Sequence, residues 1–206
     1  MCVVHAIKPG HFHDTAIDKR PRSGPTSVDE VGLDGDEHVD GSHGGRDGAV
    51  YVYADEDAEY FARQLGRPLA PGSFGENVRT SGLDVSGARL GERWRIGEVV
   101  LEVCKPRTPC ANLSQHVGVS DFHRDFHRSG RVGALCRVLH PGALTPGDTV
   151  LIETSPHHRV TVADFSAGID ADGARELLAS GVSLAKEVRA KARRIAARDR
   201  PVSSTG

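Results

Sequence analysis

Residues 83–103 read LDVSGARLGERWRIGEVVLEV, and this stretch decides the class of fold. Short valine-rich and alternating runs are separated by glycine every few residues, which is the pattern of a β-meander or barrel. Similar runs occur at 49–54 (AVYVYA), 131–140 (RVGALCRVLH) and 147–153 (GDTVLIE). The chain has 24 glycines and 11 prolines but only six Phe, three Tyr and one Trp, so the core must be built mainly from Val, Leu, Ile and Ala. The sequence therefore predicts a mainly β protein with many short strands, not a helical bundle.

Helical patterns interrupt these strand-rich parts of the sequence. DEDAEYFARQLG (55–66) has apolar residues at helical spacing between an expected cap, Asp55, and an expected end, Gly66. The Gly/Pro-rich residues that follow, 67–78, are predicted to form a loop, and the PG pair at 141–142 a turn.

Further helices are predicted after the strand-rich centre of the chain. ANLSQHVGVSDFHRDFHRSG (111–130) should form one or two short helices, with Ser120 or Asp121 as a cap. Two more helical stretches are expected around 161–167 and 171–198. The second stretch should break near Gly181, and its last helix can place Leu184, Val188 and Ile195 on one face.

The composition shifts at SPHHR (155–159), where strand-forming runs end. The shift predicts a β domain at 1–155, a small helical domain at 156–200 and a frayed tail at 201–206.

Composition and charge bound the classes of function. The net charge of −2 gives no global signature of nucleic-acid binding. No window approaches the roughly 18 consecutive apolar residues of a membrane span. The N-terminus, MCVVHAIKPGHFHD, lacks the pattern of a secretory signal, and four irregularly spaced cysteines do not form a disulfide framework. We therefore expect a reduced cytoplasmic protein.

The stretch KPRTPC (105–110) contains the cysteine with the clearest chemical interest. Pro106 and Pro109 prevent Cys110 from belonging to the interior of a strand or helix, and Lys105 and Arg107 favour its thiolate. A thiolate is both a nucleophile and a ligand for soft metals. Local chemistry leaves packing and function equally open for Cys110. Cys104 and Cys136 lie within apolar runs and are predicted to be buried.

Other candidate sites give weaker signals. His123 and His127 would share a helix face, but Arg124 and Arg128 lie between and after them, so a solvated helix is favoured over a zinc site. A Cys–His nucleophile pair stays open, because its partners could lie far apart in the sequence.

Two glycine-rich loops can approach a ligand closely. GSHGGRDGAVYVY (41–53) places His43 and Arg46 beside such a loop. PGSFGENV (71–78) can present backbone N–H groups to an anion. Neither loop matches a phosphate-binding fingerprint.

The end of the chain is strongly basic. Residues 181–200 contain seven basic and two acidic side chains, a local net charge of +5. A solvated helix face is the favoured interpretation, and a small docking surface for a protein partner or nucleic acid is the alternative.

Taken in order, several stretches resemble the MOSC domain family, named after the C-terminal domain of molybdenum-cofactor sulfurases. The resemblance covers roughly residues 14–153 and is closest to the stand-alone bacterial members that reduce N-hydroxylated bases such as 6-N-hydroxylaminopurine. The combination of FGEN, PRxPC, GRxG and GD is specific, and the tail from about 156 resembles the three-helix domain of that group. The stretches are TAIDKRP (15–21), DGDEHVDGSHGGRDGAVYVY (34–53), PGSFGENV (71–78), GERWRIGEVVLEVCKPRTPC (91–110), GRVGALCRVL (130–139) and LTPGDTVLI (144–152).

The resemblance implies a β-barrel-like domain with short helices, followed by a small helical segment. It further implies a molybdenum cofactor, with Cys110 as molybdenum ligand or sulfur carrier and as the catalytic residue. A cofactor ending in a phosphate or nucleotide needs cations and polar contacts around it. The residues placed there are Lys19, Arg20, His43, Gly75, Asn77, Arg107, Asn112 and Arg131.

The expected activity is reduction of a small N-hydroxylated substrate, and pyridoxal phosphate is not expected. The chain has no haem, iron–sulfur or flavin motif, so electrons must come from a separate redox protein, for which the basic last helix is a candidate docking surface. A cofactor or sulfur carrier with a persulfide on Cys110 is the alternative. A nucleic-acid-associated protein using the basic helix is a third hypothesis. No membrane partner is expected, and oligomerisation stays open.

Overall fold

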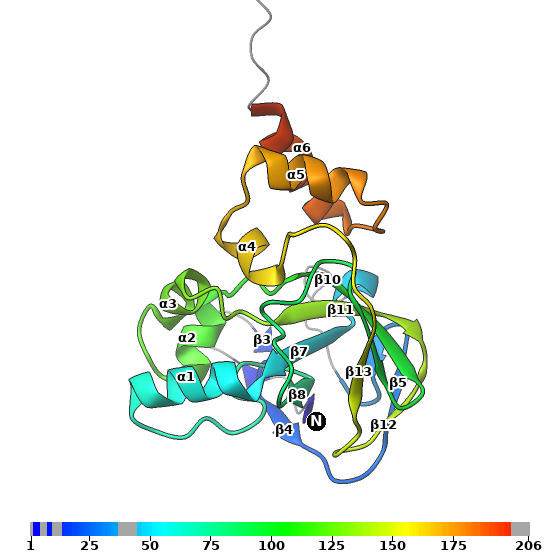
Figure 1. Cartoon of the computed structure of the whole chain (residues 1–206). Coiled ribbons are helices and arrows are strands. Elements are labelled where there is room, and N and C mark those ends of the chain that lie inside the picture. The colour runs from blue at the N-terminus through cyan, green and yellow to red at the C-terminus, as the bar shows by residue number, and fades with distance from the viewer. Residues whose placement is uncertain (1, 5–7, 10–13, 37–44, 199–206) are drawn as a thin grey trace, which may run out of the picture.

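The computed structural model describes residues 2–4, 8–9, 14–36 and 45–198, and side chains from residue 16 onward within these ranges. Strands dominate the first three quarters of the chain and helices the last (Figure 1). The strands are β1 (Cys2–Val4), β2 (Lys8–Pro9), β3 (Asp14–Thr15), β4 (Lys19–Pro21), β5 (Thr26–Asp29), β6 (Gly32–Leu33), β7 (Val50–Ala54), β8 (Val78–Thr80), β9 (Arg93–Ile96), β10 (Val99–Pro106), β11 (Ala134–His140), β12 (Gly142–Leu144) and β13 (Val150–Thr154). The helices are the 3-10 turn η1 (Arg46–Gly48), α1 (Asp55–Leu65), α2 (Ala111–Val117), α3 (Phe122–Arg128), α4 (Val162–Ala167), α5 (Ala171–Ala179) and α6 (Lys186–Arg198).

A six-stranded sheet forms the centre of the molecule, in the order β13-β9-β10-β11-β7-β8. All its neighbours are antiparallel except β7 and β8, which are parallel. Strand β10 has the sequence VVLEVCKP, and its first six residues are buried. A strand that is covered on both faces reads as a continuous apolar run, which explains why this segment does not alternate.

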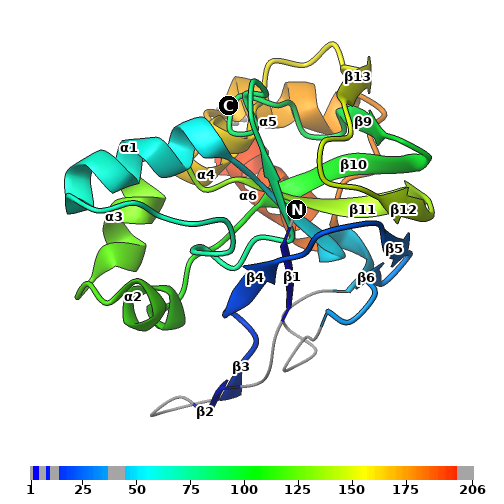
Figure 2. The same cartoon turned by 90° about the horizontal axis from the view of Figure 1, so that it is seen from below.

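A smaller sheet, β12-β5-β6, lies beside the central one (Figure 2). Its strand β12 begins at Gly142, so the predicted turn at 141–142 is shorter than expected. Gly142 pairs with Val28, and that pairing joins segments more than one hundred residues apart. No local pattern in the sequence signals such a contact. The mainly β, barrel-like class with short helices is confirmed.

Helix α1 follows β7 without a break and ends, as predicted, at Gly66 in the left-handed conformation with φ 64°. The prediction that Asp55 caps this helix is wrong. Ala54 occupies the N-cap position, and Asp55 is the first helical residue. The Asp55 carboxylate instead pairs with Nη1 of Arg79 at 3.0 Å. Asp121 does take the N-cap position of α3, but its side chain makes no capping hydrogen bond.

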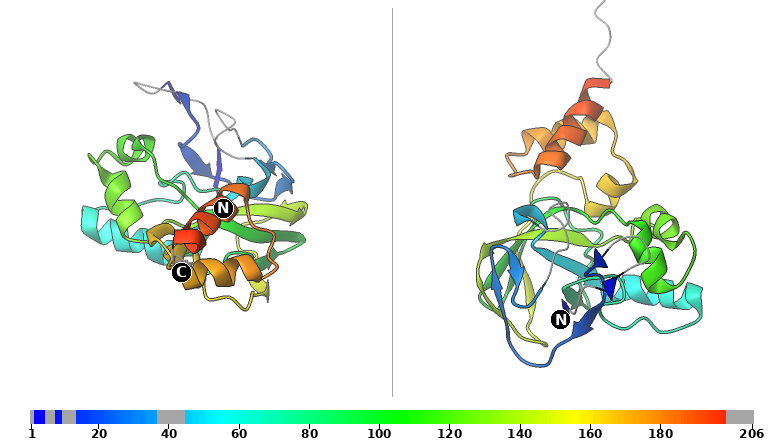
Figure 3. Two further views of the ribbon diagram at one scale, coloured as in Figure 1. Left: turned by 90° about the horizontal axis from the view of Figure 1, so that it is seen from above. Right: turned by 180° about the vertical axis from the view of Figure 1, so that it is seen from behind.

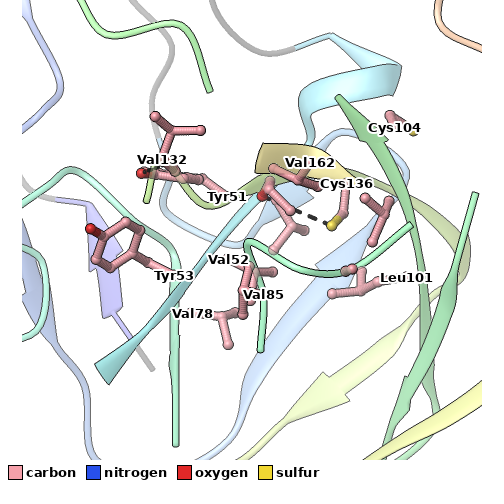
Figure 4. Packing of buried hydrophobic residues seen from close by; sticks show 14 of the residues in the cluster. Tyr51, Val52, Tyr53, Val78, Val85, Leu101, Cys104, Val132, Cys136 and Val162 are labelled. Carbon is pink, nitrogen blue, oxygen red and sulfur yellow. Dashed lines mark hydrogen bonds between the residues drawn. The ribbon is translucent and has the colours of Figure 1, made fainter. Parts of the chain in front are cut away.

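Aromatic rings pack where α1 and α3 meet the sheet. Phe61, Phe74 and Phe126 form mutual ring contacts with centroids 5.3–5.9 Å apart, and Tyr53 of β7 lies 4.6 Å from Phe74. Elsewhere the core consists mainly of Val, Leu, Ile and Ala, as the composition predicts, with Trp94 and Phe165 among the exceptions. Figure 4 shows part of the core, in which Val52 of β7 lies beside Val78 of β8.

Helices α4, α5 and α6 form a separate layer against one end of the sheet (Figure 3). The predicted break of the last helical region is confirmed, since α5 ends at Ala179 and α6 begins at Lys186. Thr161 caps α4 with a full capping box to Asp164. Arg137 of β11 donates hydrogen bonds to Oγ and O of Ser183, at 3.1 and 2.8 Å, and so ties the connection before α6 to the sheet.

No helix in the described part of the chain is long and apolar enough to cross a membrane. The predicted tail at 201–206 lies outside the described residues.

Candidate functional site

Cys110 lies at the end of a turn that joins β10 to α2. Pro106 is the last residue of β10, and Cys110 is the extended N-cap residue of α2, with φ −120° and ψ 174°. Its thiol is half-buried and free of disulfides. The backbone N–H of Arg107 donates to the carbonyl of Gly133 at 3.3 Å, so the turn is held against the loop that precedes β11.

The other two cysteines whose side chains are described have a different environment. Cys104 and Cys136 are buried, as predicted, with 2% and 0% of their surface exposed. Burial raises the pKa of Cys104 to about 11, although hydrogen bonding from Arg137 acts in the opposite direction. Burial also raises the pKa of Cys136 well above its ordinary value. Both therefore remain protonated thiols at neutral pH, and a thiol is a poor nucleophile and metal ligand.

Arg107 carries the clearest sign of a missing contact. Its guanidinium lies over the rings of Tyr51 and Phe126, with centroid distances of 5.7 and 5.8 Å. Its Nη1 is buried and has no hydrogen-bond partner among the described residues, a property it shares only with Oγ1 of Thr26. An unsatisfied buried donor costs about 1–3 kcal/mol, and more when it is charged. A phosphate oxygen would satisfy it with a charge-assisted bond.

A chain of contacts joins Arg107 to other residues that the sequence singled out. Asp36 accepts hydrogen bonds from Lys19 Nζ, at 2.8 and 2.9 Å to its two oxygens, and from Asn77 Nδ2 at 2.6 Å. Oδ1 of Asn77 accepts from the backbone N–H of Tyr51 at 2.8 Å. Because the Tyr51 ring lies under Arg107, the structure brings Lys19, Asn77 and Arg107 into one network.

Sequence reasoning missed Asp36 and Tyr51 as members of this network. A buried lysine needs a carboxylate partner, but the neighbours of Lys19, which are Asp18 and Arg20, give no sign that it is buried. Lys19 is only 9% exposed. Tyr51 gave no local signal, since it reads as one more apolar residue of a strand. Burial raises its pKa, so its hydroxyl, which donates to the carbonyl of Val132, holds its proton at neutral pH.

The loop from 71 to 77 binds an anion, but one that belongs to the protein. The carboxylate of Glu76, which is fully buried, accepts hydrogen bonds from the backbone N–H groups of Gly72 at 2.8 Å and Phe74 at 3.0 Å. Arg79 pairs with the same carboxylate. These two N–H groups are therefore not available to a phosphate, and for them the predicted anion contact is wrong.

Gly75 has a packing reason of its own in the same loop. Its φ is 79°, and a Cβ there would lie 2.8 Å from Cγ1 of Ile17. The glycine lets the loop pass directly beneath the segment that leads to Lys19. Its predicted contact with a cofactor stays a prediction.

The remaining predicted residues take separate positions. Arg20 is exposed and pairs with Asp18 at 3.3 Å. Asn112 is half-buried, two residues beyond Cys110 in α2. Arg131 pairs with Asp57 of α1 and lies 4.7 Å from the Tyr60 ring, so it braces α1 against the loop before β11. His43 lies outside the described residues.

His123 and His127 do not converge on one point. Nδ1 of His123 lies 2.8 Å from Oγ of Ser114 on α2, whereas Nδ1 of His127 lies 3.3 Å from Oγ of Ser166 on α4. Within the described ranges, no group of three or more His, Cys, Asp or Glu side chains could hold a metal ion. A metal here would rely on a sulfur-rich cofactor for its other ligands, which suits the single thiolate of Cys110.

A groove of about 590 Å³ lies elsewhere, between the sheet and the helical layer. Glu102, His158 and Ser183 are among its lining residues, and none of the predicted site residues is. Its buried carboxylate, Glu102, is already paired with Arg93 at 2.9 Å.

Comparison with known proteins identifies the family to which this chain belongs. The MOSC domain family matches residues 40–151, and the chain belongs to that family. MOSC domains are associated with the molybdenum cofactor.

Individual relatives narrow the class to stand-alone MOSC proteins. The chain is 36% identical over 158 residues to YiiM of Escherichia coli, covering 74% of this chain and 70% of YiiM. It is 32% identical over 167 residues to the uncharacterised protein YflK of Bacillus subtilis, covering 81% and 75%. The crystal structure of YiiM from Escherichia coli superimposes with a TM-score of 0.71 at 30% identity, covering 86% of this chain and 88% of that one.

A third relative is larger. A protein of Gibberella moniliformis named "Reductase" is 31% identical over 161 residues, which is 76% of this chain but only 29% of that protein.

Proposed function

We propose that this chain is a cytoplasmic, molybdenum-cofactor-dependent reductase of N-hydroxylated compounds such as hydroxylaminopurine-like bases. In the overall reaction R–NHOH, two electrons and two protons give R–NH₂ and water. One observation carries the proposal: the free thiol of Cys110 ends a proline-fixed turn that also holds Arg107, whose buried Nη1 lacks a partner in the described part of the chain. The reductase relative supports the reaction type. The three cysteines whose side chains are described are free, which suits a reducing compartment.

The residues of the turn have distinct tasks in this proposal. Cys110 supplies a soft thiolate ligand to the metal. Arg107 binds the anionic end of the cofactor, and the rings of Tyr51 and Phe126 fix the plane of its guanidinium. Lys19 and Asn77 act through Asp36, which links the start of β4 to Asn77 and so to β7. When bound, the cofactor supplies the two-electron chemistry that removes the oxygen.

Two tyrosines near the turn are poorly suited to donate protons. Burial raises the pKa of Tyr51 and of Tyr53 above the ordinary value. Their hydroxyls donate to the carbonyls of Val132 and Arg131, at 2.8 and 2.9 Å. Their hydrogen bonds hold the loop before β11, and we assign the protons of the reaction to another source.

Metal analysis tests the proposal. We would purify wild type, Cys110→Ser and Thr108→Ala from a host that makes molybdenum cofactor, and measure molybdenum, pterin and N-hydroxylaminopurine reduction with a chemical reductant. Thr108 is exposed in the same turn and makes a matched control. We expect molybdenum and turnover in wild type and Thr108→Ala, and a loss of both in Cys110→Ser.

Two results would contradict the proposal. Wild type without molybdenum, or equal molybdenum in Cys110→Ser, would remove Cys110 as the ligand. An intact mass increased by one sulfur atom on Cys110, together with no turnover, would identify a carrier instead.

The contribution of Arg107 needs a separate variant. Arg107→Ala leaves Cys110 intact but removes the cation, so we expect weaker retention of pterin during gel filtration. Arg107→Lys retains the charge but loses the planar fork, and it should recover only part of the retention.

A further inference from the structure

Helix α6 presents a surface of cations that have no ion-pair partner among the described residues. From Lys186 to Arg198 it carries six basic residues and one acidic residue, a net charge of +5. The whole chain has a net charge of −2, so the rest of the chain carries −7. Such a separation of positive and negative charge orients an approaching charged partner before contact. We call the following residues the basic face: Lys186, Arg189, Arg193, Arg194 and Arg198.

The basic face has no internal partner in the described part of the chain. None of its five side chains forms an ion pair or hydrogen bond with another described side chain, and all but the half-buried Arg189 are exposed. The single acidic residue of the helix, Glu187, does not offset them, because it pairs with Lys105 of β10. Hydrogen bonding from Lys105 lowers the pKa of Glu187, in keeping with a tight pair.

The sixth cation of the helix has a different role. Nζ of Lys191 lies 4.6 Å from the centre of the Phe165 ring and donates to the Phe165 carbonyl at 3.0 Å. Burial lowers its pKa. Lys191 therefore fixes α6 to α4, whereas the basic face points its charge outward.

The helix is a rigid platform. Val188 and Ala192 are 1% and 0% exposed, and they belong to the same core cluster as the sheet. The two bonds from Arg137 to Ser183 hold the connection before α6. A preorganised charged surface loses little entropy when it binds.

The platform is tied to the strand that leads to Cys110. Glu187 contacts Lys105, and only four residues lie between Lys105 and Cys110. The five steps from one Cα to the next that join the two residues span at most about 18 Å. A partner on the basic face would therefore lie near the turn that holds the candidate site.

These observations discriminate between classes of partner. An interfacial membrane helix needs an exposed apolar face with large side chains, but the apolar face of α6 is buried in the core. A single-stranded nucleic-acid surface needs aromatic residues for stacking, and KEVRAKARRIAAR contains none. An acidic protein fits, because redox complexes form small interfaces steered by charge.

We infer that the basic face of α6 docks an acidic electron-transfer protein that supplies this chain with electrons. The inference rests on the proposed function, since a reductase without a haem, iron–sulfur or flavin motif must take electrons from outside.

The experiment measures binding and turnover separately. The probes are an acidic flavodoxin and an acidic plant-type ferredoxin, labelled with a fluorophore, and binding is followed by anisotropy over a range of salt concentrations. The test variant is Arg193→Glu with Arg194→Glu. The control is Arg124→Glu with Arg128→Glu on α3, which changes the net charge equally at two exposed positions.

We expect at least one probe to bind wild type and the control with an affinity that falls steeply with salt. The test variant should bind at least about tenfold more weakly, chiefly through a slower association rate. Turnover driven by that probe should fall in parallel, whereas turnover with a small chemical reductant should be equal in all three proteins.

Three results would overturn the inference. The first is that neither probe binds wild type. The second is that the test variant binds as tightly as wild type. The third is that duplex DNA or anionic vesicles bind wild type more tightly than both probes do at the same salt concentration. Absence of turnover with the chemical reductant in wild type would instead contradict the proposed function, and the binding data would still report on the basic face.

Discussion

At the scale of single residues, the buried charges around the candidate site are almost all compensated inside the protein. Glu76 is satisfied by two backbone N–H groups and Arg79, and Lys19 is satisfied by Asp36. Arg107 is the exception, through its Nη1, among the described residues. Since burying an uncompensated charge is costly, the compensated pairs should matter for stability and the exception for binding.

Replacing Glu76 with Gln tests the first part of this statement. The variant keeps the shape of the side chain but removes the charge that pairs with Arg79, whose side chain is only 4% exposed. Breaking a buried pair costs about 3–5 kcal/mol, so the urea midpoint should fall markedly. Glu59→Gln is the control, because its pair with Arg63 is exposed and should change the free energy of unfolding by less than about 0.5 kcal/mol. Equal midpoints in both variants would contradict the expectation.

His158 should make stability depend on pH. Burial lowers its pKa below the ordinary 6.5. Its ring bridges two backbone groups, with Nε2 2.7 Å from the Leu90 carbonyl and Nδ1 accepting from the Val160 N–H at 3.2 Å. The second bond requires the neutral ring, since a protonated Nδ1 cannot accept.

The unfolded state therefore binds the proton more readily than the folded state. The stability that His158 contributes is complete above about pH 6.5 and is lost as the pH falls from there through the lowered pKa. Urea unfolding at several pH values between about 7.5 and 5.5 measures this slope. His158→Gln should flatten it, and His157→Gln, at an exposed neighbour, should not. An unchanged slope in His158→Gln would show that another group is responsible.

At the scale of elements, the loop before β11 is built around a close approach to β7. Gly133 has a φ of 69°, and a Cβ there would lie 2.6 Å from the carbonyl oxygen of Val52. The carbonyl of Gly133 also accepts the N–H of Arg107, which holds the turn of Cys110. The glycine thus controls the distance between the site turn and the sheet.

A pair of alanine substitutions separates crowding from backbone strain. Gly82 has a φ of 74° and no atom within 4 Å of an added Cβ, so Gly82→Ala should cost only the left-handed backbone strain, about 1–2 kcal/mol. Gly133→Ala should cost about 1–3 kcal/mol more, because backbone and tyrosine atoms must move. Thermal unfolding of the two variants measures the difference. Equal losses of stability in the two variants would show that the atoms of β7 around Gly133 move at little cost.

The elements also show what the sequence could and could not predict. Strands β7, β10 and β11, helix α1 and the break before α6 follow from local apolar runs, helical spacing and glycine signals. The PRTPC turn and Cys110 stand out because two closely spaced prolines keep Cys110 out of the interior of a strand or helix. Pairings such as β12 with β5, and the contact of Asn77 with Tyr51, depend on segments brought together only by the tertiary fold. The prediction for the loop at 71–78 failed at Glu76. The sequence of a loop that binds an anion is the same whether the anion is a ligand or a carboxylate of the protein itself.

At the scale of the whole molecule, sheet and helical layer share one core. Val160, Val162, Phe165, Leu177 and Val188 belong to the same buried cluster as the strands. Val162 and Ala163 also donate backbone hydrogen bonds to Ala88 and Ser86. The predicted boundary at 155 therefore separates two kinds of secondary structure across a continuous core.

Truncation after Ser155 should accordingly fail to give a stable domain. Removing the helical layer would expose the apolar surface that Val162 and Phe165 now cover. We expect the truncated chain to aggregate or to lose its cooperative thermal transition, whereas the full chain should unfold in a single calorimetric step. A truncated chain with an unchanged transition temperature would contradict this.

The hydrogen bonds that the two tyrosine hydroxyls of β7 donate have a consequence for biosynthesis. Tyr51 and Tyr53 bond to carbonyls 81 and 78 residues further along the chain, in the loop that leads to the strand pairing with β7. A ribosome adds roughly 5–20 residues per second, so about 4–16 s pass before these partners are made. For that time VYVYA is a fully apolar strand with no antiparallel neighbour. Every nascent copy of this protein must therefore pass through a state in which this strand lacks its antiparallel partner and is open to chaperones.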